Sequence, residues 1–154
     1  DPHVFTVRVG QPIEVTNSDQ TAHNTHTYPL NPASSPFSKI VGYKKKEIYT
    51  YDGSEKIPVK VGCDIHGWMI AYQLPVDNDF CDVSGDDGKF EIKGLPPGDY
   101  KFRIWHEEAG DLEKTFDVTI EGGDTVHETF TYPSSKFASF SGPAPKVVSL
   151  SSTR

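Results

Sequence analysis

A cysteine, a histidine and a methionine lie within one short stretch, CDIHGWM, residues 63–69. The chain contains only two cysteines and one methionine, so one of each falls here. A thiolate, an imidazole and a thioether are ligands that soft transition metals prefer. The stretch therefore predicts a metal site that includes Cys63, His66 and Met69. The same residues could instead be half a disulfide, a surface imidazole and part of a core.

A second imidazole would have to come from another strand. Two imidazoles and one thiolate around the metal, with a long thioether contact, make a type 1 copper site. The stretch NSDQTAHNTH, residues 17–26, offers His23 and His26. Residues three apart in an extended strand point to opposite faces, so only one of the two can face Cys63.

Alternating apolar residues indicate that β-strands position these ligands. Val59, Val61 and Cys63 share one parity, so Cys63 is expected to point inward at the end of a strand. Strand-like runs flank the turn residues Asp52 and Gly53, which favours a β-hairpin. A further strand after CDIHGWM then closes a first unit.

A second unit follows with the same alternation of short strands and turns, which is typical of a small antiparallel β-sandwich. Tyr100, Phe102, Ile104 and His106 share the inward parity of one strand, whereas Trp105 points away from that core. The five expected strands are residues 80–84, 89–94, 100–107, 114–120 and 125–132.

The first unit resembles a cupredoxin of the plastocyanin and amicyanin kind. GQPIEVTNSDQTAHN, residues 10–24, matches a family strand that ends in asparagine and precedes a His-Asn pair. CDIHGWM has the shortest family spacing, the one that amicyanin uses, although Gly67 stands where amicyanin-like loops usually have proline. The resemblance implies an all-β fold, a cupredoxin-like Greek-key sandwich. It also implies a copper site whose ligands are His23, Cys63, His66 and Met69.

The family pattern selects His23 over His26, because the family ligand stands directly before asparagine. Asn24 is then expected to hydrogen-bond across to the neighbouring ligand loop. His26 is expected on the other face, or as an outer partner of the site. One copper per chain, cycling between Cu(II) and Cu(I), implies that the protein carries single electrons between redox partners. It is not expected to be an enzyme.

The second unit resembles a carboxypeptidase-regulatory-like sandwich, related in architecture to transthyretin. The stretch that carries the resemblance is DDGKFEIKGLPPGDYKFRIWHE, residues 86–107. The pattern is nearly silent on activity, so this unit is expected to be a spacer, a docking surface or a rigid support. The expected domains are a copper domain over 1–77, a β-sandwich over 78–132 and a Ser/Pro-rich extended tail over 133–154.

Composition and net charge limit the classes of molecule that this chain is expected to bind. The net charge of −7 argues against nucleic acid, whose binding depends on Lys and Arg at phosphates. No apolar run approaches the ~20 residues of a membrane-spanning helix, so no span is expected in this chain. The expected partner is a redox protein, a cytochrome or an oxidoreductase. The expected location is periplasmic or extracellular, and the chain could belong to a larger or membrane-attached protein.

Several alternatives remain open at this stage. Cys63 and Cys81 could pair in a disulfide, and Trp68 could be a surface aromatic or a core residue. A copper chaperone or storage module is one alternative function. An adhesin or carbohydrate-binding module with a vestigial copper domain is another. No Ser/His/Asp set, phosphate loop or carboxylate pair supports an enzyme. A second metal site could gather further histidines, which are His3, His26, His106 and His127.

Overall fold

The computed structural model describes residues 2–123 and 125–137, and the backbone of residues 147–148. Its described regular structure consists of β-strands and one short 3-10 helix, which confirms the predicted all-β class. The chain divides into two compact units, Asp1–Asp77 and Asn78–Arg154. The strands of the first unit are β1 (Val4–Arg8), β2 (Ile13–Thr16), β3 (His23–Tyr28), β4 (Ser38–Val41), β5 (Lys46–Tyr49), β6 (Val59–Gly62) and β7 (Ile70–Val76).

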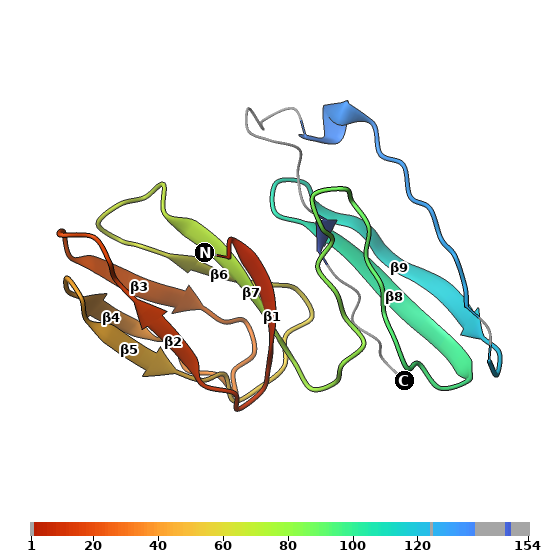
Figure 1. Cartoon of the computed structure of the whole chain (residues 1–154), viewed down its shortest axis with the longest axis horizontal. Coiled ribbons are helices and arrows are strands. Elements are labelled where there is room, and N and C mark those ends of the chain that lie inside the picture. The colour runs from red at the N-terminus through yellow and green to blue at the C-terminus, as the bar shows by residue number, and fades with distance from the viewer. Residues whose placement is uncertain (1, 124, 138–146, 149–154) are drawn as a thin grey trace. The chain divides into compact units, whose positions relative to one another are not determined.

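Two sheets make up the first unit (Figure 1). The larger sheet has the strand order β1-β7-β6-β3-β4, and the smaller one pairs β2 with β5. β1 runs parallel to β7, whereas β6 is antiparallel to both β3 and β7. Because β3 and β6 run in opposite directions, the start of β3 lies beside the end of β6. This pairing brings His23, the first residue of β3, to the same end of the sheet as Cys63.

The core of the first unit confirms the predicted parity of β6. The exposed fractions of Val59, Val61 and Cys63 are 1%, 8% and 6%. Burying one Val-sized side chain contributes roughly 1.5–3 kcal/mol, so this face anchors the strand that leads to residues 63–69. The residues that form the hydrophobic cluster between the sheets are Val7, Ile13, Tyr49, Tyr51 and Val59.

The predicted hairpin around Asp52 and Gly53 is wrong. β5 pairs with β2, while β6 pairs with β3 and β7, so the connection between them crosses from one sheet to the other. The side chain of Ser34 holds this crossing by accepting hydrogen bonds from the N–H groups of Asp52 (3.1 Å) and Gly53 (3.0 Å). Turn residues predict where a chain reverses, but they do not determine which strand the returning run pairs with.

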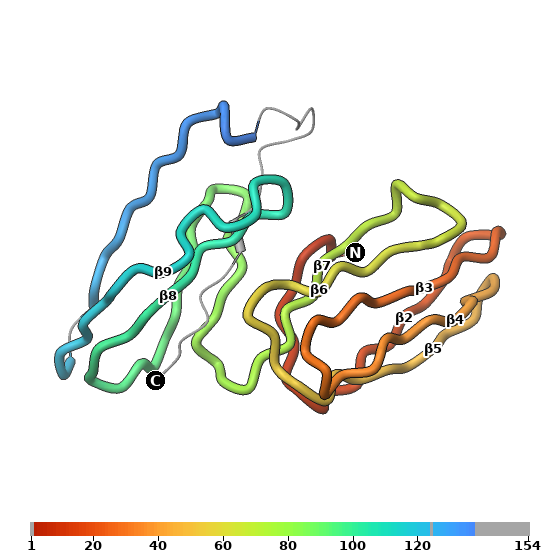
Figure 2. The backbone as a smooth tube through the Cα atoms, turned by 180° about the vertical axis from the view of Figure 1, so that it is seen from behind, coloured from red at the N-terminus to blue at the C-terminus, as the bar shows by residue number. Residues whose placement is uncertain are grey.

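The second unit is built on one antiparallel pair, β8 (Gly98–His106) and β9 (Gly110–Ile120). β10 (Val147–Val148) adds a short strand to β8, and a 3-10 helix spans Ser134–Phe137. Figure 2 shows β8 and β9 side by side from behind. A hydrophobic cluster forms on this pair, made of Tyr100, Phe102, Ile104, Leu112 and Val118.

The predicted inward parity of β8 is confirmed, since Tyr100, Phe102 and Ile104 join the cluster and His106 is fully buried. Trp105 is also buried, with 8% of its surface exposed, but it is not a member of this cluster.

Three of the five strands expected in the second unit do not form. Residues 89–94 and 125–132 contain no strand, and 80–84 contain only an isolated bridge at Val83. Apolar side chains of these segments nevertheless pack on the sheet. The Phe130 ring, for example, lies 4.8 Å from that of Phe116. Backbone groups here bond to side chains instead of strands, as where Glu91 N–H donates to Asp82 Oδ2 (2.7 Å). Alternation therefore predicted which side chains pack, but not that strands would pair.

Among the residues that the structure describes, no helix has the length and apolar character needed to cross a membrane.

Candidate metal centre

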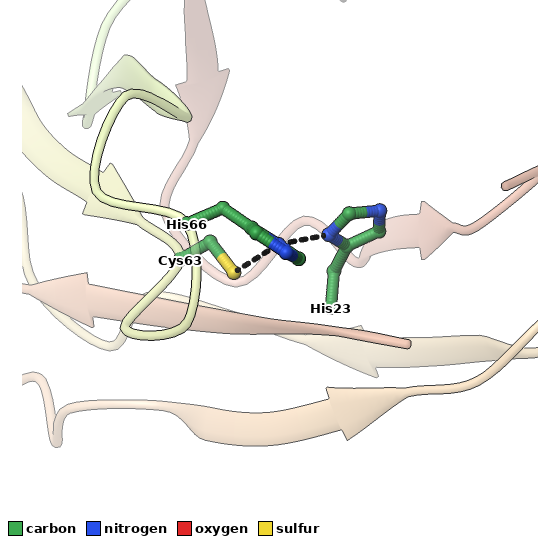
Figure 3. A group of neighbouring side chains, drawn as sticks. All are labelled: His23, Cys63 and His66. Carbon is green, nitrogen blue, oxygen red and sulfur yellow. Dashed lines mark hydrogen bonds between the residues drawn. The ribbon is translucent and has the colours of Figure 1, made fainter. Parts of the chain in front are cut away.

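Three side chains converge at the end of the larger sheet (Figure 3). The Nδ1 atoms of His23 and His66 lie 2.9 Å apart, and Cys63 Sγ lies 3.7 Å from His66 Nδ1. One donor atom from each of the three residues fits within a mutual distance of 4.8 Å. The structure thus brings together three of the four predicted ligands, one from the start of β3 and two from the loop after β6.

The loop 63–69 is closed at its base by its own backbone. Cys63 N–H donates to the Met69 carbonyl (3.1 Å), and Met69 N–H donates to the His66 carbonyl (2.9 Å). The first of these bonds brings the two ends of the loop together, where β6 stops and β7 begins. The short turn between His66 and Met69 leaves His66 facing the strand that carries His23.

Asn24 fastens this loop to β3, as predicted. Its Nδ2 donates to Asp64 Oδ2 (2.6 Å), and its Oδ1 accepts the Asp64 N–H (2.5 Å). Asn24 is buried, with 9% of its surface exposed. A carboxylate accepts stronger hydrogen bonds than a neutral group does, so the two bonds between Asn24 and Asp64 hold Cys63, the neighbour of Asp64, against the strand of His23.

The surroundings of Cys63 favour its thiolate form. Burial by itself raises the pKa of the thiol, but several donors to the sulfur outweigh burial and lower the pKa below its ordinary value. Thiolate is the form that binds metals. The main donors are the backbone N–H groups of Asn24, His66 and Ile65.

His26 lies outside the group of three and contacts Asp64 instead. Its Nδ1 lies 3.0 Å from Asp64 Oδ2, and its ring stacks on Tyr28 with the ring centroids 4.1 Å apart. Tyr28 OH also donates to Asp64 (3.0 Å). Hydrogen bonds from Asn24, then Tyr28 and His26, hold the pKa of Asp64 below its ordinary value. Asp64 is therefore an ionised carboxylate next to Cys63.

A second carboxylate touches the site from the opposite side. Asp19 Oδ2 lies 2.9 Å from His23 Nε2, and this hydrogen bond is the main cause of a raised pKa for His23. Sequence reasoning missed both Asp19 and Asp64. The only signals were that Asp64 directly follows the cysteine and that Asp19 belongs to a turn just before His23.

An open hollow lies over the two histidines. Its volume is about 370 Å³, and Met69 and Trp68 line it together with His23 and His66. Met69 is 37% exposed, and Trp68 is 80% exposed with its ring centroid 5.2 Å from that of His66. Trp68 is thus a surface aromatic and not a core residue. The remaining lining residues are Asp19 and Thr21.

The other candidates stand apart from this centre. The two cysteines, both in the described part of the chain, form no disulfide. His3 and His127 are exposed, whereas His106 is fully buried within the second unit. Within the described residues, none of these three histidines belongs to a cluster of metal-binding side chains.

The three donor atoms fit one metal ion. At the corners of a trigonal plane, two nitrogen ligands about 2.1 Å from a metal lie about 3.6 Å apart, and a nitrogen and a sulfur at about 2.3 Å lie about 3.8 Å apart. The Cys63–His66 distance of 3.7 Å is close to the second value. The His23–His66 distance of 2.9 Å is shorter than the first, so these two rings would separate by less than 1 Å.

The fold and the site together define an all-β protein with a His-Cys-His group at one end of a sheet. No protein-family model matches the chain, and a search among curated proteins gives no match. Among solved structures, the chain is similar to a purple cupredoxin from Nitrosopumilus maritimus. The identity is 18% and the TM-score 0.41, over 49% of this chain and 79% of that one. A likeness at this level assigns no function, which must be inferred from the side chains of the site.

Proposed function

We propose that this protein is a type 1 copper protein that carries single electrons. His23 and His66 would bind copper through Nδ1 and Cys63 through its thiolate, with the Met69 thioether as a weak axial ligand. The observation that supports this most directly is the convergence of two imidazoles and one thiol, with one donor atom of each within 4.8 Å of the others. When bound, copper would supply the one-electron Cu(II)/Cu(I) couple.

The donor set favours copper over zinc. Zinc sites are closed by four nitrogen, sulfur or carboxylate ligands, or are completed by a water. Here a methionine, Met69, lies three residues after His66 in the same loop, and thioethers are ligands for copper. Met69 also lines the hollow beside both histidines.

The arrangement suits electron transfer better than catalysis. Four protein ligands would leave no position for a substrate at the metal. Backbone hydrogen bonds at the base of the loop and the Asn24–Asp64 pair limit movement of Cys63, which keeps reorganisation small when the charge changes. His66 is half-buried beside the exposed Trp68 ring, so electrons would pass through His66 to a partner docked on Trp68.

The remaining functional proposals follow from charge and architecture. The partner is a redox protein, a cytochrome or an oxidoreductase, and the net charge of −7 favours one with a basic docking face. We place the protein in the periplasm or outside the cell. The second unit serves as a support or docking surface for the copper domain.

The experiment that tests this function is titration of the metal-free protein with Cu(II). An intense visible absorption band from thiolate-to-Cu(II) charge transfer is expected, and it saturates at one equivalent. Cys63→Ser abolishes the band, whereas Cys81→Ser, the matched control, retains it. A colourless Cu(II) complex, or an equal loss in both variants, would contradict the proposal.

The rate at which copper is lost to a competing chelator distinguishes an electron carrier from a copper chaperone with the same ligands. An electron carrier retains copper against a competing chelator through many oxidation and reduction cycles. Rapid loss of Cu(I) to the chelator after reduction would favour the chaperone function instead.

A further inference from the structure

The contact between His23 and Asp19 involves neither a second metal ligand nor the hydrogen bonds of Asn24 to Asp64. The two ring nitrogens of His23 have different partners, since Nδ1 faces His66 and Nε2 meets the carboxylate of Asp19 at 2.9 Å. The side chain of His23 is 15% exposed and that of Asp19 is 65% exposed. The carboxylate therefore approaches His23 from the solvent side, away from Cys63.

The segment that carries Asp19 is built around a buried asparagine. Asn17 is 7% exposed, and its Nδ2 donates to the carbonyls of Thr21 and Val41, both at 2.8 Å. Its Oδ1 accepts the N–H of Asp19, also at 2.8 Å. One side chain thus fixes both the start of the turn and its return toward His23. The position of Asp19 follows from this framework and not from chance contact of an exposed side chain.

The chemistry of imidazole gives this contact a consequence. A neutral ring carries one proton, and the nitrogen that binds a metal must be the other one. A carboxylate at Nε2 accepts that proton in a hydrogen bond, which leaves the lone pair of Nδ1 free toward Cys63 and His66. A carboxylate that accepts from a metal-binding histidine also raises the basicity of the ligand. A more basic ligand and a nearby negative charge both stabilise Cu(II) more than Cu(I).

We propose that Asp19 is a positioning residue for His23, which selects the tautomer that binds metal through Nδ1 and lowers the reduction potential of the site. The inference rests on the proposed copper function. It goes beyond that function because it assigns a specific residue outside the ligand set to the control of His23.

Two substitutions separate the two parts of this role. Asp19→Asn removes the charge but leaves an amide oxygen that can accept from Nε2. Asp19→Ala removes both the charge and the acceptor. The matched controls are Ser18→Ala, which alters the exposed neighbour in the same turn, and Glu14→Gln, which removes a carboxylate whose partner is Lys46.

The copper-loaded protein gives the first readout. Asp19→Ala is expected to weaken Cu(II) binding by about 10–100-fold, the usual effect of losing a partner behind a metal ligand, and Asp19→Asn, which keeps an acceptor, by a smaller factor. Cu(I) binding should weaken less, so the reduction potential rises while the visible band persists. Ser18→Ala and Glu14→Gln should leave both affinities and the potential unchanged. An unchanged potential in Asp19→Asn, or an equal rise in Glu14→Gln, overturns the proposal.

The metal-free protein gives a second readout that does not depend on copper. Long-range ¹H–¹⁵N correlation NMR at mildly alkaline pH reports which nitrogen of His23 carries the proton. The expected result is an Nε2–H tautomer in the natural protein and in Asp19→Asn, and a mixture in Asp19→Ala. An unchanged tautomer in Asp19→Ala overturns the proposal even if copper binds as expected. Failure of the natural protein to form the coloured complex would instead refute the copper function.

Discussion

His23 and His26 lie three residues apart on β3, and their side chains have different partners. His23 faces His66 and Cys63, whereas His26 bonds to Asp64 and stacks on Tyr28. His23→Ala is therefore expected to abolish the visible band of the copper complex, or to leave a site that added imidazole restores. His26→Ala should retain the band, because Asn24 still holds Asp64.

Visible spectra of the two variants after addition of one equivalent of Cu(II), with and without imidazole, check this prediction. Loss of the band in His26→Ala with retention in His23→Ala would mean that His26 is the ligand.

The candidate ligands could be named from the sequence, but the residues around them could not. Cys63 and His66 are separated by a fixed short spacing, and strand parity left only two candidates for the second histidine. Asp19 and Asp64 reach the site through hydrogen bonds whose geometry depends on the turn that Asn17 organises and on the register of β3. Two of these hydrogen bonds, from Asn17 to Val41 and from Asn24 to Asp64, join residues 24 and 40 positions apart, and no local pattern encodes them.

At the scale of elements, β8 ends in a titratable side chain, His106, whose burial disfavours its charged form. The ring of His106 is fully buried, and its Nδ1 accepts the N–H groups of Glu108 (3.1 Å) and Ala109 (3.4 Å). Its Nε2 has no hydrogen-bond partner among the described residues. Burial lowers the pKa of His106 below its ordinary value of 6.5. The folded state therefore binds a proton more weakly than the unfolded state.

The sign of the pH effect follows from this difference. The stability of the second unit should be constant above pH ~6.5, the pKa of an unfolded histidine. It should then decrease as the pH falls toward the lower pKa of the folded state. This pH dependence of stability can be measured by urea unfolding at a series of pH values. Fluorescence of the buried Trp105 reports unfolding of the second unit in a Trp68→Phe background.

His106→Gln should remove most of this pH dependence, and His127→Gln, at an exposed histidine, should not. Equal pH dependence in the natural protein and in His106→Gln would show that other groups control the effect.

Apolar alternation in the sequence predicted some of the strands correctly and others wrongly. Apolar alternation predicted the buried face of β6 and of β8, because burial there has the same period as the strand, and a strand was also predicted where β7 lies. It failed for the crossing between β5 and β6, since partner choice depends on which sheet edge lies nearby. It also failed for residues 89–94 and 125–132, whose side chains pack on the core without strand pairing.

At the scale of the whole molecule, each unit has its own hydrophobic cluster, and the candidate metal centre lies entirely in the first. A ligand that binds only the folded state stabilises it by about 2.7 kcal/mol when its concentration is 100 times the Kd. Copper should therefore slow hydrogen exchange of the backbone amides of β6 and leave those of β8 unchanged.

Hydrogen exchange followed by mass spectrometry, with and without one equivalent of Cu(II), measures this difference, and Cys63→Ser is the control. Equal protection of β6 and β8 by copper would show that the two units unfold together.

The hydrogen bond between Cys63 N–H and the Met69 carbonyl closes the loop at its base, so the conformation of the loop does not determine the pairing of the strands on either side. Because this bond joins the two ends, Ile65, Gly67 and Trp68 can be exchanged, and the loop around His66 lengthened, without changing the register of β6 and β7. Doubling a flexible loop costs only about 0.6 kcal/mol in closure entropy. The loop can thus change in sequence while β6 and β7 keep their positions. Differently tuned centres could be made, by evolution or by protein engineers, from changes in a few consecutive codons.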